Sequence, residues 1–327
     1  MKIAVTGASG QVGVCLVKSL VQEGHQVKVM IYDSKKGLEN LGVELFNGNT
    51  LLPDDCDALC CDAEAVFHLA AIVSITGGQQ GHVWDVNVNG TRNILNACVK
   101  HRVKKLVHFS SIHAYSTHPV NEPLDETRPL ASGKAFPYEK SKAEAQKLVL
   151  QYVKEHGLNA TIINPTGVLG PEDYMHSVKA KMLIDFYNGD IPMLMPGGFD
   201  WVDTRDLVQT AVAALHKGGT GECYLVAGKY YTLCELADII GKVTQKKMPS
   251  VIAPVWLMKA FLPFIYLYSK IMRTEPLYTD EALKSLLEGN KNVVYKKAAL
   301  HLGHSPRPIE ETIADSYAWF KQFGYIE

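Results

Sequence analysis

Tyr138 and Lys142 are the residues whose types and spacing point most directly to chemistry. Four positions apart, they place a phenol and an ammonium on one face of a helix. A phenol with an ordinary pKa of about 10 is a weak acid at neutral pH, but a neighbouring ammonium stabilises its phenolate and favours proton transfer. The spacing Tyr-x-x-x-Lys occurs four times in the chain, but only Tyr138 follows a proline, Pro137, at the start of a long helical pattern. The alternative is an exposed aromatic side chain beside a solvated lysine.

A glycine-rich turn near the N-terminus is the second feature with chemical meaning. Residues 3–6 predict a buried strand, and apolar residues at helical spacing from Val12 to Val21 predict a helix. In the turn between them, the absence of Cβ atoms lets the backbone approach a pyrophosphate, whose charge meets the positive end of the helix. The alternative is a tight turn that holds no ligand. The dinucleotide contacts expected here are Gly7, Ser9, Gly10, Gln11, Val12 and Gly13.

The composition limits the classes of protein to which the chain can belong. With 327 residues, of which 47% are hydrophobic, it can bury a complete α/β core. A net charge of −1, with basic and acidic residues interspersed along the chain, gives no electrostatic footprint for nucleic acid or an anionic membrane. We expect no signal peptide, no transmembrane segment and a cytoplasmic location. The seven cysteines have no metal-ligand spacing, so we assign them no chemistry and expect no metal site.

Strand-like and helix-like patterns alternate through the first half of the chain, which predicts an α/β fold with a Rossmann-type doubly wound parallel sheet. A smaller C-terminal substrate domain is expected to follow. We expect residues 1–165, with about 198–228 returning, to form the dinucleotide-binding domain, and about 166–197 and 229–327 to form the substrate-binding domain. The strands are expected at 26–31, 43–46, 65–69, 105–109, 160–164 and 222–227, and two long helices at 83–99 and 138–156.

Five motifs, in this order and spacing, resemble those of the extended short-chain dehydrogenase/reductase family, also called the NAD-dependent epimerase/dehydratase family. Within it, the chain looks most like the dihydroflavonol 4-reductase-like and 3β-hydroxysteroid-dehydrogenase-like branch. The resemblance continues through residues 164–171, 201–206 and 306–312, and so covers nearly the whole length. The five motifs are Thr6-Gly7-Ala8-Ser9-Gly10-Gln11-Val12-Gly13, His68-Leu69-Ala70-Ala71, Asn87-Val88-Asn89-Gly90-Thr91, Ser110-Ser111 and Tyr138-x-x-x-Lys142.

The resemblance implies roles for individual residues. Tyr138 is then the acid-base, Lys142 also holds the nicotinamide ribose, and Ser111 orients the substrate oxygen. Asn164 resembles a position that contacts the sugar nucleotide in some epimerases, and His113 faces either the pocket or the loop surface, so both are substrate candidates. Asn87 is expected chiefly to support the cofactor wall. The remaining cofactor contacts are expected at Tyr32, Asp33, Lys36, Asn49, Leu69, Ala70, Ala71, Asn87, Ser110, Pro165, Thr166 and Val168.

The choice between NAD and NADP depends on the residues after the second strand. Asp33 lies where an acid commonly accepts hydrogen bonds from the adenosine ribose and disfavours a 2′-phosphate, which favours NAD. Reductase-like relatives often carry Arg-Asp at this place and bind NADP. Tyr32 replaces that arginine here, although Lys35 and Lys36 leave NADP open. Asn49 stands where relatives usually carry an Asp directed at the adenine, and its amide can still bond there.

The reaction class is a separate question, because this fold hosts several reactions. Dehydratase relatives carry an Asp-Glu pair where Ile112-His113 stands, which argues against elimination. We expect an NAD(P)-dependent oxidoreductase that transfers hydride between the nicotinamide and the carbonyl or alcohol of an apolar or mixed small molecule. A nucleotide-sugar epimerase with tightly bound NAD is the alternative, and a non-catalytic NAD(P)-sensing protein is a third class.

Two expectations concern surfaces. Residues 251–268 are nearly continuous apolar sequence, interrupted by Pro254, Lys259 and Pro263. A buried helix or an apolar pocket wall is favoured there over a membrane span, and a membrane-surface anchor stays open.

Relatives commonly pair through the helices near 83–99 and 138–156, so the resemblance also implies a homodimer.

Overall fold

A seven-stranded parallel sheet forms the centre of the larger layer in the computed structural model, which describes residues 1–272 and 279–327, with side chains for 1–264 and 279–327. All its neighbouring strands pair in parallel, in the order β3-β2-β1-β4-β5-β6-β9. The order reverses between β1 and β4, which is where such sheets bind ligands. The strands are β1 (Lys2–Thr6), β2 (Gln26–Ile31), β3 (Glu44–Asn47), β4 (Ala65–His68), β5 (Lys105–Phe109), β6 (Ala160–Pro165) and β9 (Cys223–Val226).

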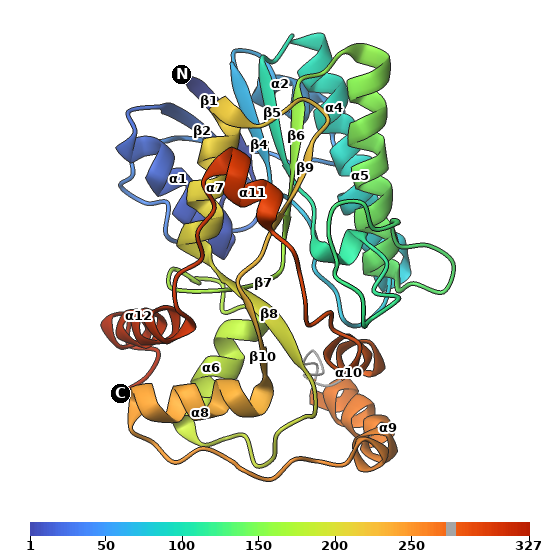
Figure 1. Cartoon of the computed structure of the whole chain (residues 1–327). Helices are drawn as coiled ribbons and strands as arrows, with labels where there is room; N and C mark the ends of the chain where they lie inside the picture. Colours follow the sequence, from blue (N-terminus) through green and yellow to red (C-terminus); the bar gives the residue numbers. More distant parts are fainter. Residues whose placement is uncertain (273–278) are drawn as a thin grey trace.

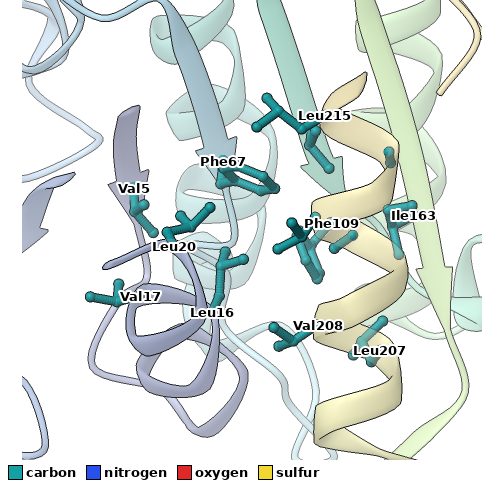
Figure 2. Close-up of a cluster of buried hydrophobic side chains, with 14 of the residues drawn as sticks. Val5, Leu16, Val17, Leu20, Phe67, Phe109, Ile163, Leu207, Val208 and Leu215 are labelled. Carbon is teal, nitrogen blue, oxygen red and sulfur yellow. The ribbon is translucent and has the colours of Figure 1, made fainter. Parts of the chain in front are cut away.

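Helices cover both faces of this sheet, as predicted for a doubly wound fold (Figure 1). Figure 2 shows one face, where α1 and α7 place Leu16, Leu20 and Leu207 against Phe67 and Phe109 of the strands. On the other face, side chains such as Ile94 and Val149 pack against Val66 and Leu106. The first set of helices is α1 (Gln11–Gln22), α7 (Thr204–Lys217) and α11 (Lys296–Leu302), and the second is α2 (Pro53–Cys60), α4 (Thr91–Lys100) and α5 (Pro137–His156).

A second, three-stranded sheet of order β10-β8-β7 lies beyond the carboxyl ends of the large sheet, with its own apolar core (Figure 1). Strand β8 belongs to this small sheet, whereas α7 and β9 return to the large layer. The division into two domains remains an expectation. The elements are β7 (Gly167–Leu169), β8 (Gly198–Asp203), β10 (Lys229–Thr232), α6 (Val178–Asn188), α8 (Leu233–Thr244), α9 (Val255–Met272), α10 (Asp280–Leu287) and α12 (Ile309–Gln322).

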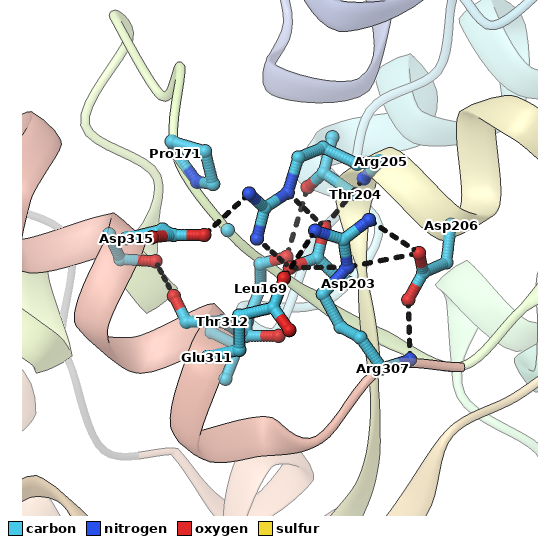
Figure 3. Close-up of polar contacts among 12 residues, drawn as sticks. Leu169, Pro171, Asp203, Thr204, Arg205, Asp206, Arg307, Glu311, Thr312 and Asp315 are labelled. Carbon is cyan, nitrogen blue, oxygen red and sulfur yellow. Dashed lines mark hydrogen bonds and ion pairs between the residues drawn. The ribbon is translucent and has the colours of Figure 1, made fainter.

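An ion-pair network joins the small sheet, α7 and the segment before α12 (Figure 3). Asp203 is the N-cap of α7, and its side chain accepts hydrogen bonds from the backbone and the guanidinium of Arg205. Arg307 donates to both oxygens of Asp206, through its backbone N–H and its guanidinium. Since Asp203 and Asp206 are both buried, the two arginines neutralise charges that could not be buried alone.

Two sequence-based expectations differ from the structure. The helix expected at residues 83–99 is present from His82 to Lys100, but its middle is wound more widely: α3 (His82–Trp84) continues into a π-type segment (Asp85–Gly90) and then into α4. This segment places Asn87 where its amide can bond the backbone of Ile72, a contact that regular helix spacing would not predict. Such segments are often found at functional sites.

The second difference concerns the apolar run at residues 251–268. Its described side chains, up to residue 264, do not line the large cavity, and Trp256, Phe261 and Phe264 are exposed, so burial in the core was the wrong expectation there. The side chains of 265–268 lie outside the described residues. In the part of the chain that the structure describes, no helix combines the length and apolar character needed to cross a membrane.

Candidate functional site

The glycine turn between β1 and α1 is shaped by close backbone contacts. Gly7 has a φ of 70°, and a Cβ there would lie 2.6 Å from the nitrogen of Ala70. A Cβ on Gly13 would lie 2.2 Å from the Gly7 oxygen, so this glycine lets helix and turn pack. A Cβ on Gly10, in contrast, would meet only the Gly7 oxygen at 3.6 Å. Gly10 therefore faces open space, which is the side from which a ligand can approach.

The start of α1 can accept an anion. Gly10 is its N-cap and supplies no side-chain cap, and the first turn carries no acidic residue. The backbone N–H groups of this turn are therefore available to a pyrophosphate, and the helix dipole favours its negative charge. The side chain of Gln11 is not available in the same way, because its amide donates to the carbonyl oxygens of Gly170 and Pro171. The turn fits the pyrophosphate of a dinucleotide.

A single cavity of about 680 Å³ extends from this turn across the carboxyl ends of the strands to the small sheet and α10. It brings together most of the residues predicted from sequence, although these lie far apart in the chain. Beyond them, its walls are mainly apolar and include Met182, Phe186, Leu194, Phe199 and Leu286. The predicted residues that line it are Gly7, Gly10, Gln11, Val12, Gly13, Leu69, Ala71, Ser110, Ser111, His113, Tyr138, Lys142, Pro165, Thr166 and Val168.

Ser111, Tyr138 and Lys142 meet at the wall of this cavity. Pro137 begins α5, so Tyr138 and Lys142 lie in its first turns, while Ser111 follows β5. Burial raises the pKa of Tyr138 to about 12, and a hydrogen bond with Ser111 opposes this shift. Burial lowers the pKa of Lys142 to about 8.

These values correct the expectation that Lys142 draws the phenol of Tyr138 toward a neutral pKa. The Lys142 amine donates instead to the carbonyl oxygen of Phe109, at 2.9 Å, and both residues are buried. Desolvation therefore outweighs any attraction between them. In this arrangement Tyr138 is a neutral phenol at pH 7, which is the form that donates a proton.

His113 faces the cavity, which answers the question of its orientation. Its imidazole lies edge-on to the ring of Tyr138, and its Nδ1 atom is 3.8 Å from a carboxylate oxygen of Glu139. Burial alone would raise the pKa of Glu139, but the nearby imidazole of His113 and a hydrogen bond from the Phe136 backbone hold it below its ordinary value. Glu281 of α10 adds a carboxylate that is buried, and it accepts a hydrogen bond from the Gly77 N–H. Burial raises the pKa of Glu281.

Asn164 does not reach the cavity, so its expected contact with substrate is corrected. Its side chain is completely buried, and its amide donates to the carbonyl oxygen of Ser111 and to Gln146. Gln146 also accepts a hydrogen bond from Ser110 and donates one to Tyr115. Gln146 was missed in the sequence, although it continues the face of α5 that carries Tyr138 and Lys142 by a further four positions. Together, Asn164 and Gln146 hold the loop that carries Ser111.

Two further buried residues support the cavity wall. The side-chain amide of Asn87 donates to the carbonyl of Ile72 and to Ser141 on α5, and its oxygen accepts from the Ile72 N–H. His68 bonds Thr6 and Thr91 through its two ring nitrogens. Burial lowers the pKa of His68 to about 3, so it is a neutral structural residue. These contacts fix the ends of β1, β4 and α5 relative to one another.

The residues predicted to meet the adenosine half lie at the ends of β2 and β3, outside the cavity lining. Tyr32, Asp33 and Lys36 are exposed there. Asn49 shapes its own loop: its side-chain oxygen accepts from the Leu51 N–H, and its backbone N–H donates to Asp55. Of the other predicted contacts, Ala70 donates its N–H to Thr6, and Ser9 is half-buried. Their contacts with a cofactor stay predictions.

Comparison with known proteins decides the family. The family model described as "NAD dependent epimerase/dehydratase family" matches residues 3–227. The chain belongs to the NAD-dependent epimerase/dehydratase family. The family consists of NAD-dependent enzymes, and the glycine turn fits that cofactor. Among the described residues, no group of three or more His, Cys, Asp or Glu side chains could hold a metal ion.

Three relatives show how far the similarity extends. The chain is 30% identical to "Sterol demethylase protein B" of Methylococcus capsulatus, over 100% of both chains. It is 25% identical to a "3-beta-hydroxysteroid dehydrogenase" of Mycolicibacterium neoaurum, over 93% of this chain and 87% of the other. Its structure matches that entitled "Crystal structure of gox2253" with a TM-score of 0.84 and 27% identity, covering 99% of both chains. The similarity thus includes the small sheet and the C-terminal helices as well as the nucleotide fold.

Proposed function

We propose that this protein is an NAD(P)-dependent oxidoreductase that transfers hydride between the nicotinamide and a carbonyl/alcohol pair of an apolar small molecule. The observation that carries the proposal is the meeting of Ser111, Tyr138 and Lys142 at the wall of a cavity whose far side is mainly apolar. A bound nicotinamide supplies the hydride, and the residues of the chain must then supply orientation and the proton.

The proposed role of Tyr138 is that of the acid-base. Its phenol is protonated at neutral pH, so it can donate to the oxygen of a carbonyl as that oxygen gains negative charge. Ser111 hydrogen-bonds Tyr138 and orients the same substrate oxygen. Lys142 holds the hydroxyls of the cofactor ribose. The apolar walls exclude water, which strengthens these polar interactions during the reaction.

The cavity also bears on the substrate class. The cavity of about 680 Å³ must hold part of the cofactor as well as the substrate, and its mainly apolar far side would face a hydrocarbon skeleton. The names of two relatives, a sterol demethylase protein and a hydroxysteroid dehydrogenase, support a sterol-like alcohol or ketone. His113 and Glu281 are among the polar groups on the substrate side, and they favour a hydroxyl group there. Others are Lys179, Asp185, Asp200 and Asn290.

A nucleotide-sugar epimerase is the second candidate, because the family model includes epimerases. A diphosphate needs cations, but the described lining of the cavity has no arginine, and its two lysines, Lys142 and Lys179, are matched by the carboxyl groups of Asp185, Asp200 and Glu281. A non-catalytic NAD(P) sensor is disfavoured because both Tyr138 and Lys142 reach the cavity.

For the cofactor we keep NAD over NADP on the basis of Asp33. We also propose a homodimer formed through α4 and α5, and a cytoplasmic location.

Cofactor fluorescence provides the test. The purified protein, with NAD(H) or NADP(H), is offered sterol and steroid ketones and alcohols, aliphatic ketones, and UDP-sugars, and Tyr138→Phe is run in parallel. We expect a change in reduced-cofactor fluorescence with an apolar alcohol or ketone that the variant does not give. Interconversion of UDP-sugars without net change in cofactor would support the epimerase instead. Cofactor binding without turnover of any class would favour a sensor.

A further inference from the structure

An exposed apolar patch covers one end of the small-sheet layer. It consists of Met193, Val251, Ile252, Trp256, Phe261 and Phe264, and we call it the α9 patch. Trp256 is 70% exposed and Phe264 is 67% exposed. Single exposed apolar residues are ordinary, but a group of this kind marks an interaction site.

Backbone contacts make the α9 patch continuous. The N–H of Leu194 donates to the Val251 carbonyl, and the N–H of Ala253 donates to the Leu194 carbonyl, both at 2.8 Å. This short bridge places Met193 beside Val251 and Ile252, and α9 begins only three residues later. On the helix, Trp256 and Phe264 are eight positions apart, which is slightly more than two turns, and so they share one face.

The charge around the α9 patch differs from that of the whole chain. Residues 239–274 contain six Lys or Arg and no Asp or Glu, whereas the rest of the chain has 27 Lys or Arg against 34 Asp or Glu. Among these cations, Lys259 lies on α9 itself and Lys247 precedes Val251 by four residues, and both are exposed. The expectation of no footprint for an anionic membrane therefore holds for the average charge but not for this segment.

We propose that the α9 patch docks on the surface of an anionic lipid bilayer. Helices that lie in the membrane interface combine exposed Trp and Phe with Lys or Arg at the border of the apolar face, and α9 has both. The apolar side chains enter the boundary between headgroups and acyl chains, and Lys247 and Lys259 meet lipid phosphates. A second copy of the chain fits less well, because a symmetric contact would bring these lysines toward their own equivalents.

The α9 patch adjoins the cavity, which gives the docking a consequence. Met193 belongs to the patch and also lines the cavity, as does the neighbouring Leu194. Helix α10, next to α9 in Figure 1, supplies Ser285 and Leu286 to the cavity wall. An apolar compound dissolved in the bilayer would therefore meet the cavity rim without crossing water. The docking itself does not depend on the proposed reaction.

Vesicle co-sedimentation of the full chain tests the proposal. Vesicles of phosphatidylcholine alone are compared with vesicles in which about 30% of the lipid is anionic phosphatidylglycerol. We expect binding to the anionic vesicles that weakens at least threefold when salt is raised from about 0.05 to 0.5 M. The double variant Trp256→Ser/Phe264→Ser should lose binding, and Lys247→Glu/Lys259→Glu should weaken it on anionic vesicles only.

The matched control is Leu300→Ser, because Leu300 is 71% exposed but lies on α11 in the other layer. It should bind vesicles like the unchanged protein. All variants alter exposed side chains, so their melting temperatures should equal that of the unchanged protein. Thermal melts therefore check that the variants are folded. The proposal is overturned if the protein does not bind anionic vesicles at low salt, or if the Trp256→Ser/Phe264→Ser variant binds as well as Leu300→Ser. It is also overturned if light scattering shows that this double variant only dissociates a dimer, in which case a second copy covers the patch.

Discussion

The imidazole of His113 lies edge-on to the phenol ring of Tyr138, with ring centroids 5.8 Å apart and an interplanar angle of 61°. The same imidazole faces Glu139, whose carboxylate accepts the Phe136 N–H and so caps α5. His113 therefore connects the candidate acid-base to the start of the helix that carries it. A disturbance at His113 would be felt by Tyr138 through packing and through the charge of Glu139.

The first prediction concerns pH dependence. Burial raises the folded-state pKa of Tyr138 to about 12, so the phenol stays protonated from pH 6 to 10. Carbonyl reduction uses the protonated form, so Tyr138 should leave its kcat flat over this range, and a fall near pH 8 would report the loss of charge on Lys142. Alcohol oxidation needs the phenolate, whose fraction rises about tenfold per pH unit below the pKa, so its kcat/KM should rise with pH. Steady-state rates in both directions provide the measurement, and a plateau of oxidation below pH 8 would contradict the assignment.

His113 is predicted to position Tyr138 rather than to move the proton. His113→Phe keeps an aromatic ring beside Tyr138 but removes the partner of Glu139. Since that partner helps to lower the pKa of Glu139, the pKa of this carboxyl should rise in the variant. We expect a loss in kcat of about tenfold or less, which is below the range for a lost acid-base. A loss as large as that caused by Tyr138→Phe would make His113 part of the proton path.

The glycine turn allows a matched pair of variants. At Gly10 an added Cβ would meet only the Gly7 oxygen, at an ordinary contact distance of 3.6 Å, so Gly10→Val should fold normally but place its branched carbons where the pyrophosphate belongs. At Gly13 even one methyl group would overlap the Gly7 oxygen, so Gly13→Ala should lower the melting temperature as well. Calorimetric titration with NAD and NADP, together with thermal melts, separates the two effects. Unchanged cofactor affinity in Gly10→Val would remove the basis of the dinucleotide site.

Much of the site could be predicted because it depends on local sequence. The glycine turn needs a strand, a turn and a helix within about 20 residues, and Tyr138 and Lys142 follow from the repeat of one helix. Ser111 could be placed at the cavity because it follows a strand. Asp33 also follows a strand, and its contact with a cofactor stays a prediction. Gln146 carried a signal of the same kind, since it shares the face of Tyr138 and Lys142, and only the structure shows what it holds in place.

Other parts depend on contacts between distant segments. Glu281 reaches the cavity from α10, more than a hundred residues beyond Tyr138, with no motif around it. Asn164 lies within strand β6, near its carboxyl end, and its side chain is completely buried against Ser111 and Gln146. The apolar sequence of α9 does not show whether other segments of the chain cover its apolar side chains. In all three cases, the packing of segments that are distant in the sequence decides whether the side chain is buried, lines the cavity or is exposed.

The network around Arg307 predicts a stability effect that is separate from catalysis. Arg307→Met leaves the buried carboxylate of Asp206 without its guanidinium and should cost about 3 kcal/mol of unfolding free energy. Lys296→Met, which alters an exposed cation at the start of α11, is the control and should change little. Urea unfolding at pH 7 measures both variants. Equal midpoints would show that the network does not stabilise the fold.

Asp203 in the same network predicts the response of stability to acid. Burial alone would raise its pKa, but hydrogen bonds from Arg205 hold the folded-state pKa below the ordinary value of 3.8. The unfolded chain therefore binds more protons in this range, so the contribution of Asp203 is complete above pH 3.8 and is lost as pH falls through the folded pKa. Unfolding midpoints between pH 5 and 2.5 should fall less steeply in Asp203→Asn than in the unchanged protein.

The decisive prediction separates a catalyst from a sensor. Tyr138→Phe removes only a hydroxyl and leaves the ring contact with His113, the glycine turn and Lys142 in place. Cofactor affinity should therefore stay within about twofold, whereas kcat should fall by about 10² to 10⁴, the usual effect of removing a positioned acid-base. Ser111→Ala should cost less, because Tyr138 remains. Lys142→Met should weaken both cofactor binding and turnover, since the amine serves the ribose and also bonds the Phe109 carbonyl. Rapid-quench rates and cofactor titrations on the three variants give the comparison. If Tyr138→Phe retains most of its kcat, the proton comes from elsewhere, and the buried carboxyl of Glu281, with its raised pKa, is the next group to test.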